Sequence, residues 1–280
     1  MRTTLAHVMG MVAVLAVFPG WACAQSSEAL ALAGRLFDRA GLAVQLQSLP
    51  AQFEQGLSQN PSKLPDEMMA ALAEAGKKSF AVATLRQEIV PILAQTLPAA
   101  DIKQVLAWLD GQVGRRMTLA EESAAGSMTA ENMQAYFESE KKKPASPERV
   151  KLIADLIEAT KAVEIGATFI EAMALGVAVG MDATEPVEKR IGIANLRSRL
   201  RVVLPPAKLR ASVGAAVPAM EGFTYRQISD ADLAAYVEFN DSALGQRYNQ
   251  AVTKALTESL TRASMRIGEI LKTTPAKEKV

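Results

Sequence analysis

From residue 25 to the C-terminus, the chain is made almost entirely of helix-forming residues. It is rich in alanine, leucine, glutamine, glutamate and arginine, only 5% of the chain is aromatic, and no segment shows a sustained alternation of β-branched residues. These abundant residues favour the helix, whereas a half-buried strand needs such alternation. The sequence therefore predicts an all-α protein.

Prolines and short polar clusters divide this sequence into segments. Proline suits the first turn of a helix and disfavours helix in the residue before it, so each cluster predicts a helix end or start. The clusters lie at residues 58–61, 64–65, 97–98, 141–144, 182–186 and 205–206. Ser146-Pro147-Glu148 predicts a clear helix start, with a capping serine, proline at the first position and an acid near the positive helix end.

An internal repeat is the most informative pattern. Residues 101–116 align without gaps with residues 232–247 at an offset of 131, and acidic, aliphatic, aromatic, glycine and arginine positions recur in register. Upstream, Val90-Pro91 is similar to Val217-Pro218, and residues 36–38 are similar to 156–158. We therefore predict two diverged helical repeats, 25–145 and 146–280, joined near Lys141–Ser146.

Each repeat is predicted to contain an αα-corner, two helices joined by a tight turn. In the second copy, Ser229 and Asp232 form a pair like a capping box, the helix stops near residues 240–241, and Ser242 caps a long terminal helix with one apolar stripe. A glycine follows each turn, where a missing Cβ allows close helix approach, and an aromatic residue precedes it as a core anchor. The predicted structural residues are Trp108, Gly114, Phe239, Ser242 and Gly245.

At this second corner the sequence resembles the bacterial exported family known as domain of unknown function 2059. The match runs from Ser229 through Tyr236 and Phe239 to Gln246, within about 190–250, and more faintly covers the first corner. Asn240 stands where the family often has a second aromatic residue, and Ala243 where it often has proline. The resemblance implies an all-helical exported protein and implies no particular activity.

The N-terminus has the pattern of a secretory signal peptide. One basic residue, Arg2, precedes an apolar stretch at residues 8–18, and small residues at Ala22 and Ala24 precede Gln25. We expect residues 1–24 to be a signal peptide cleaved between Ala24 and Gln25, which places the protein in the periplasm. The alternative is a lipoprotein anchored at Cys23, but the usual aliphatic residue three places before the cysteine is missing. No later segment is expected to span a membrane.

Removal of residues 1–24 would take away the most versatile catalytic groups. The chain would keep 30 basic and 30 acidic residues and no histidine or cysteine. This excludes disulfides, metal sites built on histidine or thiolate, a Ser-His-Asp triad and a cysteine nucleophile. We predict no catalytic residue, no cofactor and no metal site, and the balanced charge gives no support to a nucleic-acid partner.

A basic segment is the best candidate for binding an anionic partner. Residues 189–210 contain seven lysines and arginines and no acid. Arg190, Arg197 and Arg201 are expected to share one helical face that could meet phosphate or carboxylate groups of lipid or peptidoglycan. The alternative is a solvated helix face whose charge is balanced by acids elsewhere.

Residues 162–181 form the most apolar stretch after residue 25. Glu164, Thr168 and Glu171 give it a polar stripe, so we expect a core helix that faces water on that side. The alternative, a hydrophobic-ligand carrier, requires an apolar cavity of at least roughly 300 Å³ beside Gly176 and Gly180.

The sequence thus favours an exported, periplasmic, all-helical binding or interaction module of the cell envelope. Its expected partner is an envelope protein, lipid or peptidoglycan, and self-association is a further expectation. The alternatives are a carrier of a hydrophobic ligand and a histidine-independent glycan hydrolase, which would need two carboxylates about 5–10 Å apart in a cleft.

Overall fold

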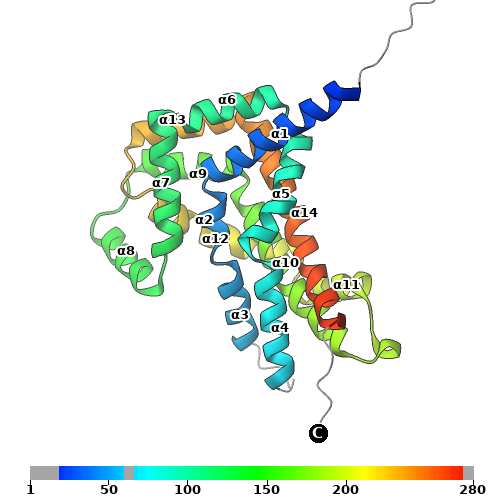
Figure 1. Ribbon diagram of the computed structural model, residues 1–280. Coiled ribbons are helices and arrows are strands. Elements are labelled where there is room, and N and C mark those ends of the chain that lie inside the picture. The colour runs from blue at the N-terminus through cyan, green and yellow to red at the C-terminus, as the bar shows by residue number, and fades with distance from the viewer. Residues whose placement is uncertain (1–18, 60–65, 274–280) are drawn as a thin grey trace, which may run out of the picture.

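The computed structural model describes residues 19–59 and 66–273, and within these ranges all regular secondary structure is helical, without strands (Figure 1). The prediction of an all-α protein is confirmed.

The first half of the described chain contains eight helices. They are α1 (Pro19–Arg39), α2 (Leu42–Leu46), α3 (Leu49–Gln59), α4 (Asp66–Ser79), α5 (Val82–Thr96), α6 (Ala99–Leu109), α7 (Gln112–Ser127) and α8 (Ala130–Lys142).

The second half begins after the short connection 143–146 and ends in the longest helix of the described chain. Its elements are α9 (Pro147–Thr160), α10 (Ala162–Thr184), a 3₁₀ turn η1 (Val187–Lys189), α11 (Ile193–Val203), α12 (Pro206–Thr224), α13 (Asp230–Asp241) and α14 (Ala243–Thr273).

Capping side chains fix the helix starts that the sequence marks. The Ser146 hydroxyl accepts from the Arg149 N–H at 3.1 Å, and the Ser229 hydroxyl accepts from the Asp232 N–H at 3.1 Å. At the second corner, the Gly245 N–H donates to the Ser242 hydroxyl at 3.0 Å. These contacts satisfy N–H groups that have no partner within the helix, which confirms the predicted starts.

Two further breaks have no proline or polar cluster to mark them. Gly41 separates α1 from α2 with φ 67°, and Lys161 separates α9 from α10 with φ 57°. Both lie in the left-handed region, which lets a chain leave one helix and start another at a new angle. Residues 36–38 are similar in sequence to residues 156–158, and each break stands five residues after the start of its segment, Gly41 after Leu36 and Lys161 after Leu156.

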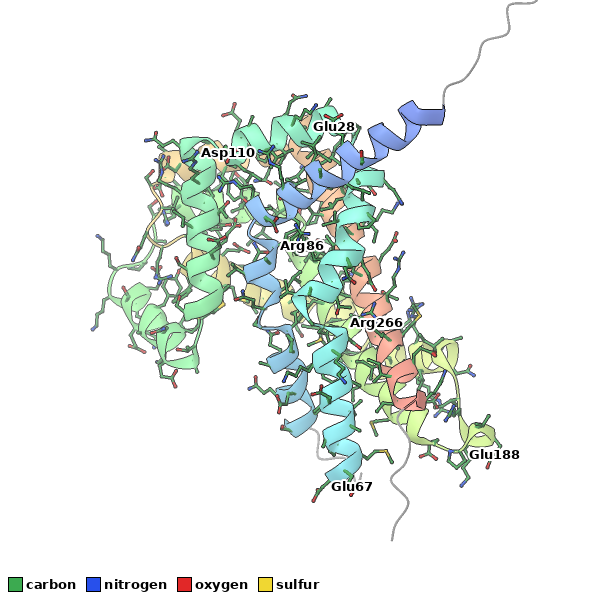
Figure 2. All side chains as sticks on the ribbon, viewed as in Figure 1. Glu28, Glu67, Arg86, Asp110, Glu188 and Arg266 are labelled. Atoms are coloured by element: carbon green, nitrogen blue, oxygen red, sulfur yellow. The ribbon has the colours of Figure 1, made fainter. Side chains whose placement is uncertain are left out.

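The second helix of each corner packs on the opposite half of the chain. Helix α14 lies against α4, α5 and α6, and Figure 2 shows Arg266 of α14 beside α4 and α5, where it donates to the Ser79 carbonyl at 3.1 Å and to Glu88. Helix α7 lies against α12 and α13, and its buried Met117 shares a core with Leu156 and Leu233. Both helices also pack on their own half, α14 on α10 and α7 on α6, so each of them joins the two halves.

Helix α10 runs parallel to α14 along much of its length. The Ser264 hydroxyl donates to the Ala172 carbonyl at 2.6 Å, and Gly268 lies against Val179. A Cβ on Gly176 would lie 2.9 Å from an Ile267 methyl carbon, and one on Gly180 would lie 2.2 Å from a Leu72 methyl carbon. The space beside both glycines is filled, so the cavity that the carrier hypothesis required there is absent.

Among the described residues, one stretch, Ala162–Ala183 of α10, is long and apolar enough to cross a membrane by length and composition. We expected no segment after the signal peptide to be long and apolar enough to span a membrane, and Ala162–Ala183 corrects that expectation. Helix α10 is packed along α14, while Ile170 and Met181 on its outer side are exposed.

Candidate functional site

The two corners meet face to face. The Trp108 indole stacks on the Phe239 ring with 4.1 Å between centroids and 14° between planes. The Tyr236 ring is also stacked with Trp108, with 5.5 Å between centroids and 17° between planes. Trp108 and Tyr236 both pack against two hydrophobic clusters, each built from residues of both halves. The aromatic residues of the corners are therefore core anchors, as their spacing predicts, and they anchor the corners to each other.

Two ion pairs cross this junction in a reciprocal arrangement. The Arg247 guanidinium of the second corner donates to Asp101 of the first at 2.7 Å, and Arg116 of the first corner donates to Asp232 of the second at 2.5 Å. Each hydrogen-bonded guanidinium lowers the pKa of its aspartate. The partners of these aspartates could not be predicted from one corner alone, because each aspartate meets the arginine of the other corner.

The corner glycines occupy equivalent surroundings. A Cβ on Gly114 would lie 2.4 Å from the Trp108 carbonyl oxygen, and one on Gly245 would lie 2.0 Å from the Phe239 carbonyl oxygen. No side chain fits at either distance, so the close approach expected of both glycines is confirmed.

A half-buried carboxylate with two tyrosine partners lies beside this junction. Oε1 of Glu121, on α7, accepts from the hydroxyls of Tyr225 at 2.7 Å and Tyr236 at 2.9 Å. Its Oε2 accepts a longer bond from the Gln45 amide at 3.4 Å. Burial raises the pKa of Glu121 despite these hydrogen bonds, and the pKa values of both tyrosines are raised by burial first and by this carboxylate next.

A second carboxyl group, Glu221 on α12, belongs to the same interior region. Burial and the nearby charge of Glu121 raise the pKa of Glu221 to about 7. A carboxyl group with such a pKa holds its proton near neutral pH and could in principle act as a general acid.

Neither glutamate was predicted as a site residue, although the sequence holds a signal for both. Glu221 stands four residues after Val217 and four before Tyr225, and both neighbours are buried. Glu121 stands four residues after the buried Met117 and three before the buried Ala124. Each acid thus interrupts an apolar helical stripe, which predicts a carboxyl group directed at the core.

The basic segment is only partly arranged as expected. Helix α11 begins at Ile193, so Arg190 does not share a helical face with Arg197 and Arg201. The Arg190 guanidinium instead donates to the carbonyls of Ala183 and Glu185 at 3.0 and 2.9 Å, at the end of α10. Arg190 therefore closes a helix terminus, which corrects its assignment to the binding face.

The other cations of this segment have no such partner. Within the described chain, no ion pair or side-chain hydrogen bond involves Lys189, Arg197, Arg199, Arg201, Lys208 or Arg210. Among them stand three valines with large exposed fractions, Val187 at 74%, Val202 at 79% and Val203 at 79%. Figure 2 shows Glu188, which lies in the connection between α10 and α11, at the opposite end of the molecule from Glu28.

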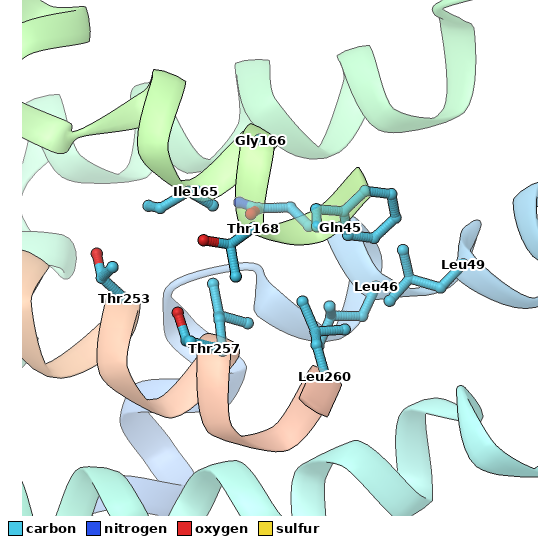
Figure 3. Close-up of a pocket in the computed structure, with 11 residues that line it drawn as sticks. Gln45, Leu46, Leu49, Ile165, Gly166, Thr168, Thr253, Thr257 and Leu260 are labelled. Carbon is cyan, nitrogen blue, oxygen red and sulfur yellow. The ribbon is translucent and has the colours of Figure 1, made fainter. Parts of the chain in front are cut away.

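A cavity of about 190 Å³ lies between α2, α10 and α14 (Figure 3). Thr168, of the polar stripe expected for α10, is one of its lining residues and is half-buried. Neither Glu121 nor Glu221 lines this cavity.

The remaining predictions concern metal sites and the signal peptide. Within the described ranges, no group of three or more histidine, cysteine, aspartate or glutamate side chains is placed to hold a metal ion. Residues 1–18 of the predicted signal peptide lie outside the described residues, as do the side chains at the expected cleavage site, Ala24 and Gln25.

No family model, no curated protein and no solved structure matches this chain. The resemblance to the domain of unknown function 2059 therefore stays a prediction that rests on the corner residues.

Proposed function

We propose that the protein is an exported binding module of the cell envelope, built from two copies of a helical corner, that contacts an anionic surface through the basic segment 189–210. The observation that carries this proposal is the group of cations in that segment that lack carboxylate partners, together with the exposed valines among them. Cations next to exposed aliphatic side chains suit the headgroup region of an anionic membrane, where charge and apolar contact both contribute.

The reciprocal contacts of the two corners support the duplicated architecture. Residues 131 apart occupy matching places: Trp108 meets Phe239, and each aspartate meets the arginine of the other corner. Such reciprocity is characteristic of an isologous contact between two similar units, here within one chain.

The proposed surface is tested by cosedimentation with vesicles of phosphatidylcholine alone or mixed with phosphatidylglycerol. We expect binding only to the anionic vesicles, and we expect it to weaken as salt is raised. The variant Arg197→Glu/Arg201→Glu should abolish it. Lys142→Glu/Lys143→Glu is the matched control, because it makes the same change in net charge at exposed residues near the end of α8 and should retain most of the binding.

A valine variant distinguishes a lipid from a soluble anionic partner. Val202→Ser/Val203→Ser should weaken vesicle binding and leave binding to a soluble polyanion unchanged if the partner is a lipid. Equal loss of binding in the arginine variant and its lysine control would contradict a specific basic surface.

The pair Glu121 and Glu221 supports a second candidate, the carboxylate-based glycan hydrolase. The raised pKa of Glu221 is the property that a general acid needs. Against it, Glu121 already accepts two tyrosine hydroxyls, and neither acid lines the cavity between α2, α10 and α14. Release of soluble fragments from peptidoglycan, lost in Glu221→Gln, would favour this function over the binding module.

A further inference from the structure

Helix α8 is weakly attached to the rest of the fold. No side chain of α8 is buried, whereas α7 before it and α9 after it each bury three residues. Within the described chain, no other helix packs along α8, and none of its residues joins the hydrophobic clusters of the core. Figure 1 shows α8 at the side of the molecule. A segment with so little buried apolar surface opens at a small cost in free energy.

The polar contacts of α8 are local. Among the described residues, each hydrogen bond or ion pair of its side chains joins groups at most five positions apart in the sequence. The Asn132 amide donates to the Ser127 carbonyl at 2.8 Å at one end, and the Glu140 carboxylate accepts from the Ala145 N–H at 3.0 Å at the other. These bonds stabilise the turns that join α8 to α7 and α9, and they do not attach α8 to a distant part of the chain.

The Tyr136 ring links α8 to the second half of the chain. It packs against Phe223 of α12, with 5.8 Å between centroids and 88° between planes. A Cβ on Gly222 would lie 2.3 Å from the Tyr136 hydroxyl oxygen, so this glycine leaves room for the ring. Phe223 is only 2% exposed, and the Arg226 guanidinium lies over its ring, 3.8 Å from the centroid. Tyr136 therefore helps to keep Phe223 buried.

We propose that α8 is a hinged arm, which opens from α12 on its two connections, 128–129 and 143–146, while the other helices stay folded. Opening separates Tyr136 from Phe223 and uncovers an aromatic ring that the closed protein hides, so the arm controls access to this face of α12. A free helix of 13 residues is marginally stable in water, so α8 loses its helical hydrogen bonds when it opens. This inference is independent of the proposed function, because α8 lies outside the basic segment.

Amide hydrogen exchange followed by mass spectrometry tests the arm, because a helical amide exchanges when its hydrogen bond opens. In the full chain we expect the amides of α8 to be protected, but to exchange at least about tenfold faster than those of α7 and α9. We also expect low concentrations of urea to accelerate exchange in α7 and α9 and to leave exchange in α8 unchanged, since a local opening exposes little surface.

Two alanine variants of adjacent aromatic residues test the link to α12. Tyr136→Ala removes the contact with Phe223 and should accelerate exchange in α8 by at least roughly twofold, the lower range for an aromatic pair, without changing exchange in α7 or α9. Phe137→Ala is the matched control, because it makes a similar truncation on the same helix at a residue that is 42% exposed. It should not accelerate exchange in α8, since both variants gain helix propensity equally.

Two glycine variants of α12 test the same link from the other side. In Gly222→Ala the new Cβ would lie 2.3 Å from the Tyr136 hydroxyl oxygen, so Tyr136 must move, and exchange in α8 should be faster than in the parent chain. Gly214→Ala is the control on the same helix, because the nearest atom to its Cβ is a Val163 methyl carbon at 3.9 Å. It should leave exchange in α8 unchanged.

The proposal fails if α8 exchanges as slowly as α7 and α9 and with the same dependence on urea, or if its amides are unprotected in the parent chain. Equal effects of Tyr136→Ala and Phe137→Ala would also overturn it, because the link to α12 would then not hold the arm. So would a Tyr136→Ala variant in which exchange in α7 and α9 accelerates as much as in α8, because α8 would then unfold only with its neighbours.

Discussion

Trp108 and Phe239 stand 131 residues apart, at equivalent positions of the predicted repeat, and their rings stack on each other where the two corners meet. The ion pairs of Asp101 with Arg247 and of Asp232 with Arg116 cross the same junction. The corners thus supply one of the contacts that hold the two halves together.

We expect these two ion pairs to contribute equally. The side chains of Asp101 and Asp232 are 12% and 19% exposed, and their arginines are about half to one-third exposed. Double-mutant cycles with Asp→Asn and Arg→Gln at each pair, measured by urea denaturation, should each give a favourable coupling energy, and the two coupling energies should be equal. A coupling confined to one pair would contradict the equivalence of the corners.

Alanine at the corner glycine should destabilise the protein. In Gly245→Ala the new Cβ would lie 2.0 Å from the Phe239 carbonyl oxygen, so the backbone must shift, and we expect a loss of about 1–3 kcal/mol in the free energy of unfolding. The control is Gly126→Ala on α7, where no atom lies within 4 Å of the new Cβ. That change should stabilise the helix by about 0.5 kcal/mol. Equal effects at both positions in chemical denaturation would contradict the close approach.

The contacts of α7 and α14 across the two halves predict that neither half folds alone. A fragment 25–145 lacks α14, which packs on α4, α5 and α6, and a fragment 146–280 lacks α7, whose Met117 completes the core around Leu233. Each purified fragment should show reduced helix content by circular dichroism and no cooperative thermal unfolding, and mixing the two should restore both. A monomeric fragment that unfolds cooperatively would show that these contacts are not needed for stability.

The sequence predicted the parts of the fold that depend on local chemistry. Ser146, Ser229 and Ser242 cap the expected helices, and the proline clusters at 97–98, 141–144, 182–186 and 205–206 lie at helix ends, because capping and proline effects act within one turn. Residues 60–65 of the two earlier clusters lie outside the described residues. The breaks at Gly41 and Lys161 were not predicted, because a single left-handed residue has no distinctive neighbours.

Contacts between distant segments could not be predicted in this way. The partner of Asp101 is 146 residues away, and Glu121 meets Tyr225 from another helix of the other half. The interpretation of Arg190 was wrong for a related reason. We placed it on the same helix as Arg197 and Arg201, but α11 begins at Ile193 and Arg190 bonds to carbonyls at the end of α10. Burial of Glu221 was readable from its apolar neighbours, but the charge that raises its pKa further comes from α7.

Glu221 makes the stability of the protein depend on pH in a direction opposite to that of the paired aspartates. Its pKa is about 7 in the folded protein against about 4.3 in an unfolded chain, so between these values the native state binds more protons than the unfolded state. Stability from this group is therefore greatest below about pH 4.3 and is lost as pH rises through 7, by about 3 kcal/mol in all. Asp101 and Asp232, whose pKa values are lowered, act the other way and lose their contribution as pH falls through their folded pKa values. Chemical denaturation should show Glu221→Gln to be more stable than the parent chain at pH 8 and similar to it near pH 4.5. Glu164→Gln, which alters an exposed residue of α10, is the control, and a parent chain whose stability does not fall between pH 5 and 8 would contradict the burial of Glu221.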